Sequence, residues 1–423
     1  MLICRMIFAV TLCAVALCVS VTGATERADI VVARDGTGRF ATIQAALDSV
    51  NADAAHPRVI LIKNGTYNEK LYIRKSYVTL VGEDRNLTRI VFAELREEWN
   101  RDHNGSDWGA GVINIDTAAT DITIANLTVL NNHGSLYGTH NKHQFTIRGY
   151  GTRIILLYCN VISDGGDALS LWNRQNGMYY HSDCTFEGWV DYVCPRGWCY
   201  ITNSQFFGHN KPSASLWHDG GNDKKQKFVI ANSFIDGVAG FPLGRNHRDG
   251  QFYFLHCTFS ANMADRAFYR PPSSTTEWVW GDRHYFYDCH REGGDYAWFG
   301  NNLETAEGSP RAENIDAKWA FDGKWDPEST MSSVLPFATI PSPGRSASGV
   351  GGQGTVLAWK AGRNARSHRV YFGKTGEPEF VRDQKETQFT PGQLEAKTTY
   401  FWRVNEVTDD STVTGEDWSF STR

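Results

Sequence analysis

Residues 158–161, Tyr-Cys-Asn-Val, and residues 183–186, Asp-Cys-Thr-Phe, share a pattern in which a small residue precedes a polar residue and an apolar β-former. Related strings occur at 125–129, 203–206, 232–234, 256–259 and 288–290. Successive copies lie 33, 25, 20, 29, 24 and 32 residues apart when they are aligned on Asn126, Cys159, Cys184, Ser204, Ser233, Cys257 and Cys289. A repeat of this length is typical of a parallel β-solenoid, in which each coil adds strands to sheets along one axis. The sequence therefore predicts an all-β chain whose main body is a right-handed parallel β-helix.

The residues before these repeats predict a closed end for the solenoid. A Gly-rich turn at 36–40 precedes residues 42–50, whose apolar side chains recur on one face of a helix, with Thr42 placed to cap its start. Runs of β-formers follow at 58–62 and 77–81. We expect the helix to cover strand edges that would otherwise invite aggregation.

The overall composition is that of an ordinary soluble protein. The 423 residues include 42 Lys and Arg against 47 Asp and Glu, and the net charge of −5 gives no basic excess for binding nucleic acid. Aromatic residues make up 13% of the chain, with 14 Trp, which suits sugar binding as well as core packing. The length exceeds that of one hydrophobic core and indicates two domains or a repeat structure.

Residues 1–24 have the features of a secretory signal peptide. Arg5 supplies a positive charge, residues 6–19 are apolar, and small residues end at Ala24. The apolar run is short for a membrane span, and polar residues follow it directly. We predict a secreted protein, extracellular or periplasmic, with no membrane association in its mature form; a retained anchor is the alternative.

The composition changes again after Phe337. Residues 339–354 are rich in Pro, Gly and Ser, and they predict a linker between a β-helix domain at 25–338 and a module at 355–423. Short alternating strands in this module indicate a small β-sandwich. With Trp359, and with Leu394 six residues before Tyr400, the module resembles a fibronectin type III domain. We expect a spacer or scaffold, with sugar binding as the alternative.

Six cysteines remain after residue 24. Four of them lie in predicted strands, where we expect buried, unpaired thiols: Cys159, Cys184, Cys257 and Cys289. Cys194 and Cys199 could form a disulfide across a short loop, and the sequence leaves this open. No ligand spacing typical of zinc is present, and we expect no metal and no other cofactor.

Four segments of the repeat region carry residues suited to ester chemistry. Gln144, Asp167 and Asp191 lie within 142–148, 163–169 and 187–193, and Arg245 adds a cation within 242–247. Ester cleavage needs a nucleophile, donors for the developing oxyanion and a proton for the leaving group. If successive coils stack, these segments can lie side by side on one face.

In these segments the chain resembles the pectin methylesterases, carbohydrate esterase family 8, and the resemblance extends from about residue 30 to residue 337. The four segments follow the order of four family motifs, with a small insertion between Asp167 and Asp191. The resemblance implies hydrolysis of methyl esters in pectin, a homogalacturonan polysaccharide. It implies Asp191 as the nucleophile, Asp167 as general acid and then base, Gln144 as oxyanion donor and Arg245 as the partner of the nucleophile. We expect a monomer.

The chain departs from the family near the site. Gly166 stands where a second Gln is common, Arg196 lies in a segment that replaces the family's Ile-Phe-Gly, and His247 replaces a Trp. These changes leave the reaction intact but alter the expected sugar platform. The residues expected to bind substrate are His247, Arg196, Trp189, Trp172 and Trp280, although each Trp could equally serve packing.

Two other functions fit the same fold. A β-helix glycoside hydrolase or lyase could use the acidic pair at 164–167 on pectic polysaccharide. However, we find no Gly-His-Gly segment as in polygalacturonases and no acidic cluster suited to a calcium-dependent lyase. A non-catalytic carbohydrate-binding β-helix protein is the second alternative, since fold alone does not establish function.

Overall fold

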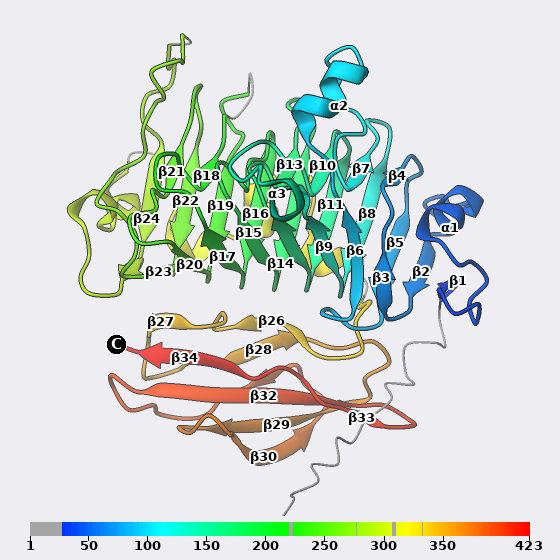
Figure 1. Cartoon of the computed structure of the whole chain (residues 1–423). Coiled ribbons are helices and arrows are strands. Elements are labelled where there is room, and N and C mark those ends of the chain that lie inside the picture. The colour runs from blue at the N-terminus through cyan, green and yellow to red at the C-terminus, as the bar shows by residue number, and fades with distance from the viewer. Residues whose placement is uncertain (1–27, 220–222, 276, 307–309, 332) are drawn as a thin grey trace, which may run out of the picture.

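The computed structural model describes residues 28–219, 223–275, 277–306, 310–331 and 333–423. Their main body is a solenoid of parallel strands, and the C-terminal strands lie along one side of it (Figure 1). The predicted signal peptide, residues 1–24, lies outside the described residues. In the part of the chain that the structure describes, no helix is long and apolar enough to cross a membrane.

Three sets of parallel strands run along the solenoid. The first forms a ten-stranded sheet: β1 (Ile30–Val32), β2 (Arg58–Ile62), β5 (Val78–Gly82), β8 (Thr120–Ala125), β11 (Thr152–Leu157), β14 (Met178–Ser182), β16 (Trp198–Thr202), β19 (Phe228–Ala231), β22 (Phe252–Leu255) and β24 (His284–Tyr287). The second forms a nine-stranded sheet: β3 (Gly65–Tyr67), β6 (Thr88–Phe92), β9 (Thr128–Asn131), β12 (Asn160–Ser163), β15 (Thr185–Gly188), β17 (Gln205–Gly208), β20 (Phe234–Gly237), β23 (Thr258–Phe259) and β25 (His290–Arg291). The third comprises a four-stranded sheet and a two-stranded continuation: β4 (Leu71–Ile73), β7 (Ile113–Ile115), β10 (Ile147–Gly149) and β13 (Leu169–Leu171), then β18 (Leu216–Trp217) and β21 (Gly244–Arg245).

Helices are few and short. They are α1 (Ile43–Ser49), α2 (Arg96–Asp102), α3 (His133–Tyr137), α4 (Ala317–Ala320) and α5 (Pro327–Thr330), with 3₁₀ turns η2 (Ala297–Phe299), η3 (Asn302–Thr305) and η4 (Ala312–Asn314). The predicted N-terminal helix is confirmed as α1. The Thr42 side chain accepts a hydrogen bond from the Ala45 amide, and Ile43, Ala46 and Leu47 are buried.

The repeated strings form the turn between the first and second sheets. In each string, the residue directly before the small residue has a positive φ, for example 56° at Tyr158 and 56° at Asp183. Asn and Asp tolerate this left-handed backbone better than most residues, which explains the polar character of the position. The predicted alignment is wrong by one residue in its first copy. Asn160 pairs with Thr128, which sets Leu127 opposite Cys159.

The interior of the solenoid is largely apolar and continuous. Ile124 stacks on Leu156, and Ile201 stacks on Ile230, all at or near zero exposure. The buried imidazole of His181 lies between these two pairs, so the stack is not wholly apolar. All six cysteines of the described residues are buried and free. The prediction of buried, unpaired thiols is therefore confirmed for Cys159, Cys184, Cys257 and Cys289. Cys194 and Cys199, whose pairing the sequence left open, form no disulfide.

The C-terminal strands form two further sheets. One contains β26 (Thr339–Ser342), β28 (Leu357–Lys360) and β31 (Gln388–Phe389), and the other contains β27 (Ala347–Val350), β34 (Trp418–Thr422), β32 (Thr399–Val407), β29 (Ser367–Gly373), β30 (Glu379–Gln384) and β33 (Thr412–Val413). The stretch predicted as a linker, 339–354, thus contains two strands of these sheets. The Arg345 amide donates to Asn203 Oδ1 at 3.2 Å, and the Phe337 ring packs on Tyr158. These contacts join the C-terminal sheets to the turn of the solenoid.

Candidate active site

Coil stacking brings Asp167 and Asp191 into register. Leu169 bridges to Val193 in parallel, so the residues two places earlier, Asp167 and Asp191, occupy equivalent positions of neighbouring coils. Their backbones continue the stacking, because the Asp167 amide donates to the Val190 carbonyl at 3.0 Å. Both have left-handed backbones, with φ of 60° and 50°, and both are 3% exposed. The prediction that stacking gathers the two carboxylates is consistent with this register.

Arg245 reaches Asp191 from β21, two coils further along. Its Nε donates to Asp191 Oδ1 at 2.9 Å, and its Nη2 donates to Oδ2, so the pairing is bidentate. Burial raises the pKa of Asp191 to about 7, and the Arg245 guanidinium opposes that rise. The arrangement yields a fixed carboxylate whose basicity exceeds that of an ordinary surface Asp.

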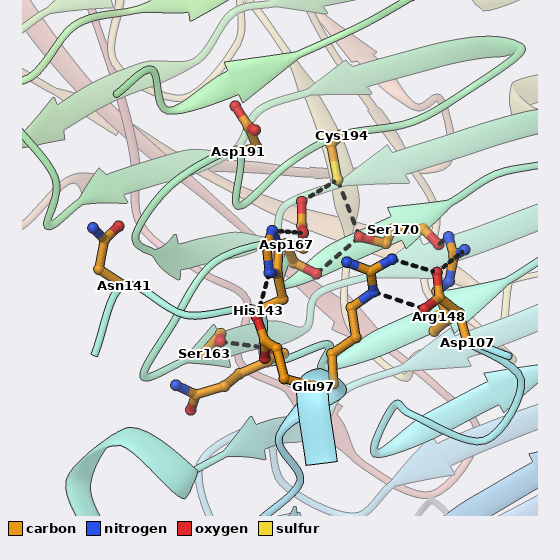
Figure 2. Close-up of polar contacts among 12 residues, drawn as sticks. Glu97, Asp107, Asn141, His143, Arg148, Ser163, Asp167, Ser170, Asp191 and Cys194 are labelled. Carbon is orange, nitrogen blue, oxygen red and sulfur yellow. Dashed lines mark hydrogen bonds and ion pairs between the residues drawn. The ribbon is translucent and has the colours of Figure 1, made fainter. Parts of the chain in front are cut away.

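Asp167 lies between a thiol and an imidazole (Figure 2). Cys194 Sγ donates to Asp167 Oδ1 at 3.2 Å, and His143 Nε2 lies 3.6 Å from Oδ2. On its other side, His143 Nδ1 lies 2.7 Å from Oε1 of Glu97, a residue of α2. A carboxylate, an imidazole and a second carboxylate therefore form a chain that ends on Asp167.

Sequence reasoning did not single out His143 or Glu97. His143 lies directly before Gln144, so its place in a motif was a usable signal. Glu97 precedes it by 46 residues, in a helix that projects beside β7 and β10 (Figure 1), and no local pattern links the two.

The predicted oxyanion donor, Gln144, is fully buried. Its Nε2 donates to the Thr139 carbonyl at 2.8 Å, and its Oε1 accepts from the Gly134 amide at 2.8 Å. In this conformation the side chain ties α3 and the loop after it to the solenoid. An oxyanion contact requires the amide to release Thr139.

Gly166 leaves no space for the second Gln that the family commonly has there. A Cβ on Gly166 would lie 2.7 Å from both the Val190 carbonyl oxygen and the Val190 Cγ1. The neighbouring coil thus approaches the backbone too closely for any side chain. This close approach explains the departure that the sequence shows.

Guanidinium groups and indole rings alternate beside the acidic pair. Arg148 and Arg196 come from the coils before and after Trp172, at 3.8 and 4.8 Å from its ring centroid, and Arg196 also lies 3.8 Å from the Trp217 ring. Arg196 is 0% exposed. Cations therefore occupy the space over Trp172, which was predicted as a sugar platform, and Arg196 is buried beneath the site surface.

The other predicted binding residues lie in different surroundings. The His247 ring packs edge-on against Trp217 at 4.8 Å, and burial lowers the pKa of His247. The Trp189 ring stacks on two imidazoles, those of His140 at 5.2 Å and His209 at 5.7 Å. Trp280 lines a separate cleft that contains none of the four predicted catalytic residues.

Across the described ranges, no group of three or more His, Cys, Asp or Glu side chains is arranged to hold a metal ion. The chemistry available at the site is that of the two carboxylates, the Arg245 guanidinium, the His143 imidazole and the Cys194 thiol. Such a set suits nucleophilic attack by a carboxylate assisted by a second acid or base.

Comparison with known proteins relates this site to one family. The pectinesterase family model matches residues 29–237. "Probable pectinesterase 56" of Arabidopsis thaliana is 30% identical over 176 residues, 40% of this chain and 55% of that protein. "Pectinesterase 2" of Citrus sinensis is 25% identical over 214 residues, 49% of this chain and 38% of that protein. The chain thus spans between about a third and about half of the length of these curated relatives.

Solved structures confirm the parallel β-helix fold. A pectin methylesterase in complex with a hexasaccharide has a TM-score of 0.57 at 23% identity, and the match covers 71% of this chain and 98% of that one. Pectin methylesterase from carrot has a TM-score of 0.53 at 17% identity, covering 66% of this chain and 88% of that one.

Proposed function

We propose that this protein, whose residues 29–237 match the pectinesterase family model, hydrolyses galacturonate methyl esters of pectin to pectate and methanol. The observation that carries the proposal is the bidentate pairing of Arg245 with Asp191 beside the equivalent Asp167 of the neighbouring coil. This arrangement supplies a fixed nucleophile and a separate proton donor, which are the two groups that ester cleavage needs.

In the first half of the reaction, an Asp191 oxygen attacks the ester carbonyl carbon. The bond from that carbon to the methoxy oxygen breaks, and the methoxy oxygen takes the proton of Asp167 to leave as methanol. Asp191 is then joined to the galacturonate carbonyl as an acyl anhydride. Arg245 holds the attacking carboxylate in one orientation, so little entropy is lost in reaching the transition state.

In the second half, Asp167 acts as a base. It takes a proton from water, and the hydroxide attacks the galacturonate carbonyl carbon of the anhydride. The bond to Asp191 breaks and returns the nucleophile as a carboxylate, while the galacturonic acid releases its proton to solvent. One water is consumed, and one methanol and one acid are formed.

We assign His143 as a positioning residue for Asp167. With Glu97 Oε1 accepting from Nδ1, the Nε2 atom faces the Asp167 carboxyl. Because the His143 side chain is 41% exposed, it also connects the buried acid to solvent. Gln144 remains the proposed oxyanion donor, a role in which its amide moves from Thr139 to the substrate.

The remaining assignments follow from the same proposal. We propose pectin as the partner, a secreted location, a monomer, and substrate contacts by His247 and Trp189. We also propose that the C-terminal sheets form a fibronectin type III-like β-sandwich that serves as a scaffold. The hydrogen bond from the Arg345 amide to Asn203 supports a scaffold role, since it fixes the C-terminal sheets to the solenoid.

Methanol release from highly methylated pectin tests the function. Asp191→Asn removes the nucleophile, and we expect a rate loss of about a thousandfold or more with pectin binding retained. Asp48→Asn, an exposed carboxyl on α1, is the matched control and should keep full activity. New reducing ends or unsaturated products would favour the glycosidase or lyase instead, and binding of pectin without methanol would favour a non-catalytic protein.

A further inference from the structure

A cleft of about 720 Å³ lies where three neighbouring strands of the ten-stranded sheet begin. Lys227, Gln251 and Arg283 directly precede β19, β22 and β24, and all three line the cleft. Trp319 of α4 and Trp280 contribute aromatic walls. The volume is within the range of small-molecule sites, and the cleft shares no lining residue with the candidate active site.

Positive charge in this cleft is incompletely neutralised. Arg283 is 5% exposed, and its guanidinium donates only to neutral oxygens: the Lys224 carbonyl at 2.6 Å, Gln251 Oε1 at 3.1 Å and the Asp249 carbonyl at 3.0 Å. Arg283 Nε is buried without a hydrogen-bond partner. Among the residues that the structure describes, no carboxylate lies within ion-pair distance of Arg283, Lys224 or Lys225. The carboxylate of Asp249 lies near enough to act on Arg283, but it accepts from the amides of Val279 and Trp280 and forms no ion pair with the guanidinium. A buried cation without an ion-pair partner favours an anion in the adjoining cleft.

The other charges in the cleft do not cancel this excess. Lys227 Nζ lies 2.7 Å from Asp322 Oδ1, so these two residues neutralise each other. Asp282 is the second carboxylate in the lining, which leaves one negative charge to three positive ones, those of Arg283, Lys224 and Lys225. The cleft therefore retains a net positive charge.

Aromatic rings stand beside these cations. The Arg283 guanidinium lies 5.0 Å from the Trp280 ring centroid, and the ammonium of Lys227 lies 4.7 Å from that of Trp319. Both indoles are partly exposed. Of the described cations, a single one contacts each of these rings, unlike the two over Trp172, and the exposed part of each indole gives an apolar surface for the C–H faces of a sugar. The ammonium and guanidinium groups give charge-assisted hydrogen bonds to a carboxylate.

We propose that this cleft binds carboxylate-bearing sugars, and that its ligand is the de-esterified galacturonate chain. The inference rests on the proposed function, which makes that chain the product. A methyl ester removes the negative charge, so the cleft discriminates the processed polymer from the unprocessed one. Binding here retains the protein on polymer that it has already de-esterified.

The test uses the full-length protein with Asp191→Asn, so that no turnover occurs, and a de-esterified galacturonate tetramer as the probe. Hydrogen–deuterium exchange separates the two sites, because protection at 223–228 and 280–287 reports the cleft and protection at 142–148 reports the candidate active site. The tetramer should protect the cleft segments, and the fully methyl-esterified tetramer should protect them much less.

Charge reversal then tests whether positive charge causes the binding. In Lys225→Glu, about tenfold more tetramer should be needed for the same protection of the cleft, since the new carboxylate repels the ligand carboxylate. Lys385→Glu changes an exposed lysine directly after β30; it is the matched control and should leave the protection unchanged. Absence of cleft protection, or equal protection in Lys225→Glu, would overturn the proposal. A protein that shows cleft protection while its wild type releases no methanol would refute the proposed function and leave this site standing.

Discussion

Replacement of Arg245 by Gln should move the pH dependence of the reaction as well as lower its rate. Burial raises the pKa of Asp191 to about 7, and Arg245 is the largest influence in the opposite direction. The nucleophile is the ionised carboxylate, so activity in the wild type should fall as the pH drops through about 7. Without Arg245 the pKa of Asp191 should rise further, and the acid limb of the profile should move to higher pH.

The magnitude follows from the two hydrogen bonds that are lost. Hydrogen bonds to charged groups each contribute about 1.5–3 kcal/mol, and about 3 kcal/mol for the pair is a cautious value because Gln can replace part of the contact. Each 1.36 kcal/mol corresponds to one pH unit, so the limb should move upward by about two pH units. At pH 7 the ionised fraction of Asp191, and with it the rate, should fall roughly fiftyfold.

The assay is the initial rate of methanol release, measured as kcat/KM between pH 5 and pH 9. Arg153→Gln is the matched control, because Arg153 makes a comparable bidentate pair with Asp121 on the first sheet, at 2.8 and 2.7 Å. That variant should keep the wild-type profile. If Arg245→Gln lost activity with an acid limb that coincided with that of the wild type, the reasoning about charge would be refuted and Arg245 would act by position alone.

Three further outcomes are expected from the same site. Glu97→Gln weakens the hydrogen bond that orients His143 by about 1 kcal/mol. We therefore expect kcat to fall about fivefold with little change in KM, and equal changes in kcat and KM would contradict a positioning role. Gly166→Ala forces a Cβ against Val190 and should lower the free energy of unfolding by about 1–3 kcal/mol in denaturant titration, while Gly376→Ala, which meets open space, should not. A chelator should leave methanol release unchanged, and loss of activity that returned with added metal would contradict the mechanism.

Much of the fold was predictable because the solenoid repeats one local arrangement. Each coil must bury apolar side chains at equivalent positions, so the strand pattern recurs and identifies the architecture. The one-residue error at Asn126 arose because two adjacent positions share a preference for small or polar residues. The left-handed turn selects Asn and Asp for their backbone, and the next position selects small side chains for burial. Only the strand register shows which of these two positions a given residue occupies.

The sequence predicts where the candidate site residues lie in the solenoid better than it predicts how their side chains are oriented. Asp167 and Asp191 are held by stacking, so their neighbourhood follows from the repeat itself. The direction of Gln144 depends on α3, and the partner of His143 comes from α2, an excursion from the solenoid. Such contacts depend on how loops pack, and no periodic pattern encodes them. The indole of Trp172 was predicted to face a sugar, but neighbouring coils supply guanidinium groups that lie over it.

The alternation of cations and indoles explains how two carboxylates can remain side by side at low exposure. Asp167 raises the pKa of Asp191, while Arg245 and the buried Arg196 oppose burial and this repulsion. Arg196 can be buried because the rings of Trp172 and Trp217 stabilise its charge, and because Asp219 Oδ2 lies 3.9 Å from its Nη2. Asp219 offsets only part of this charge, because Arg196 still lowers the pKa of Asp191. Part of the positive field of Arg196 therefore acts on the nucleophile, which keeps Asp191 ionisable near neutral pH while burial keeps it reactive.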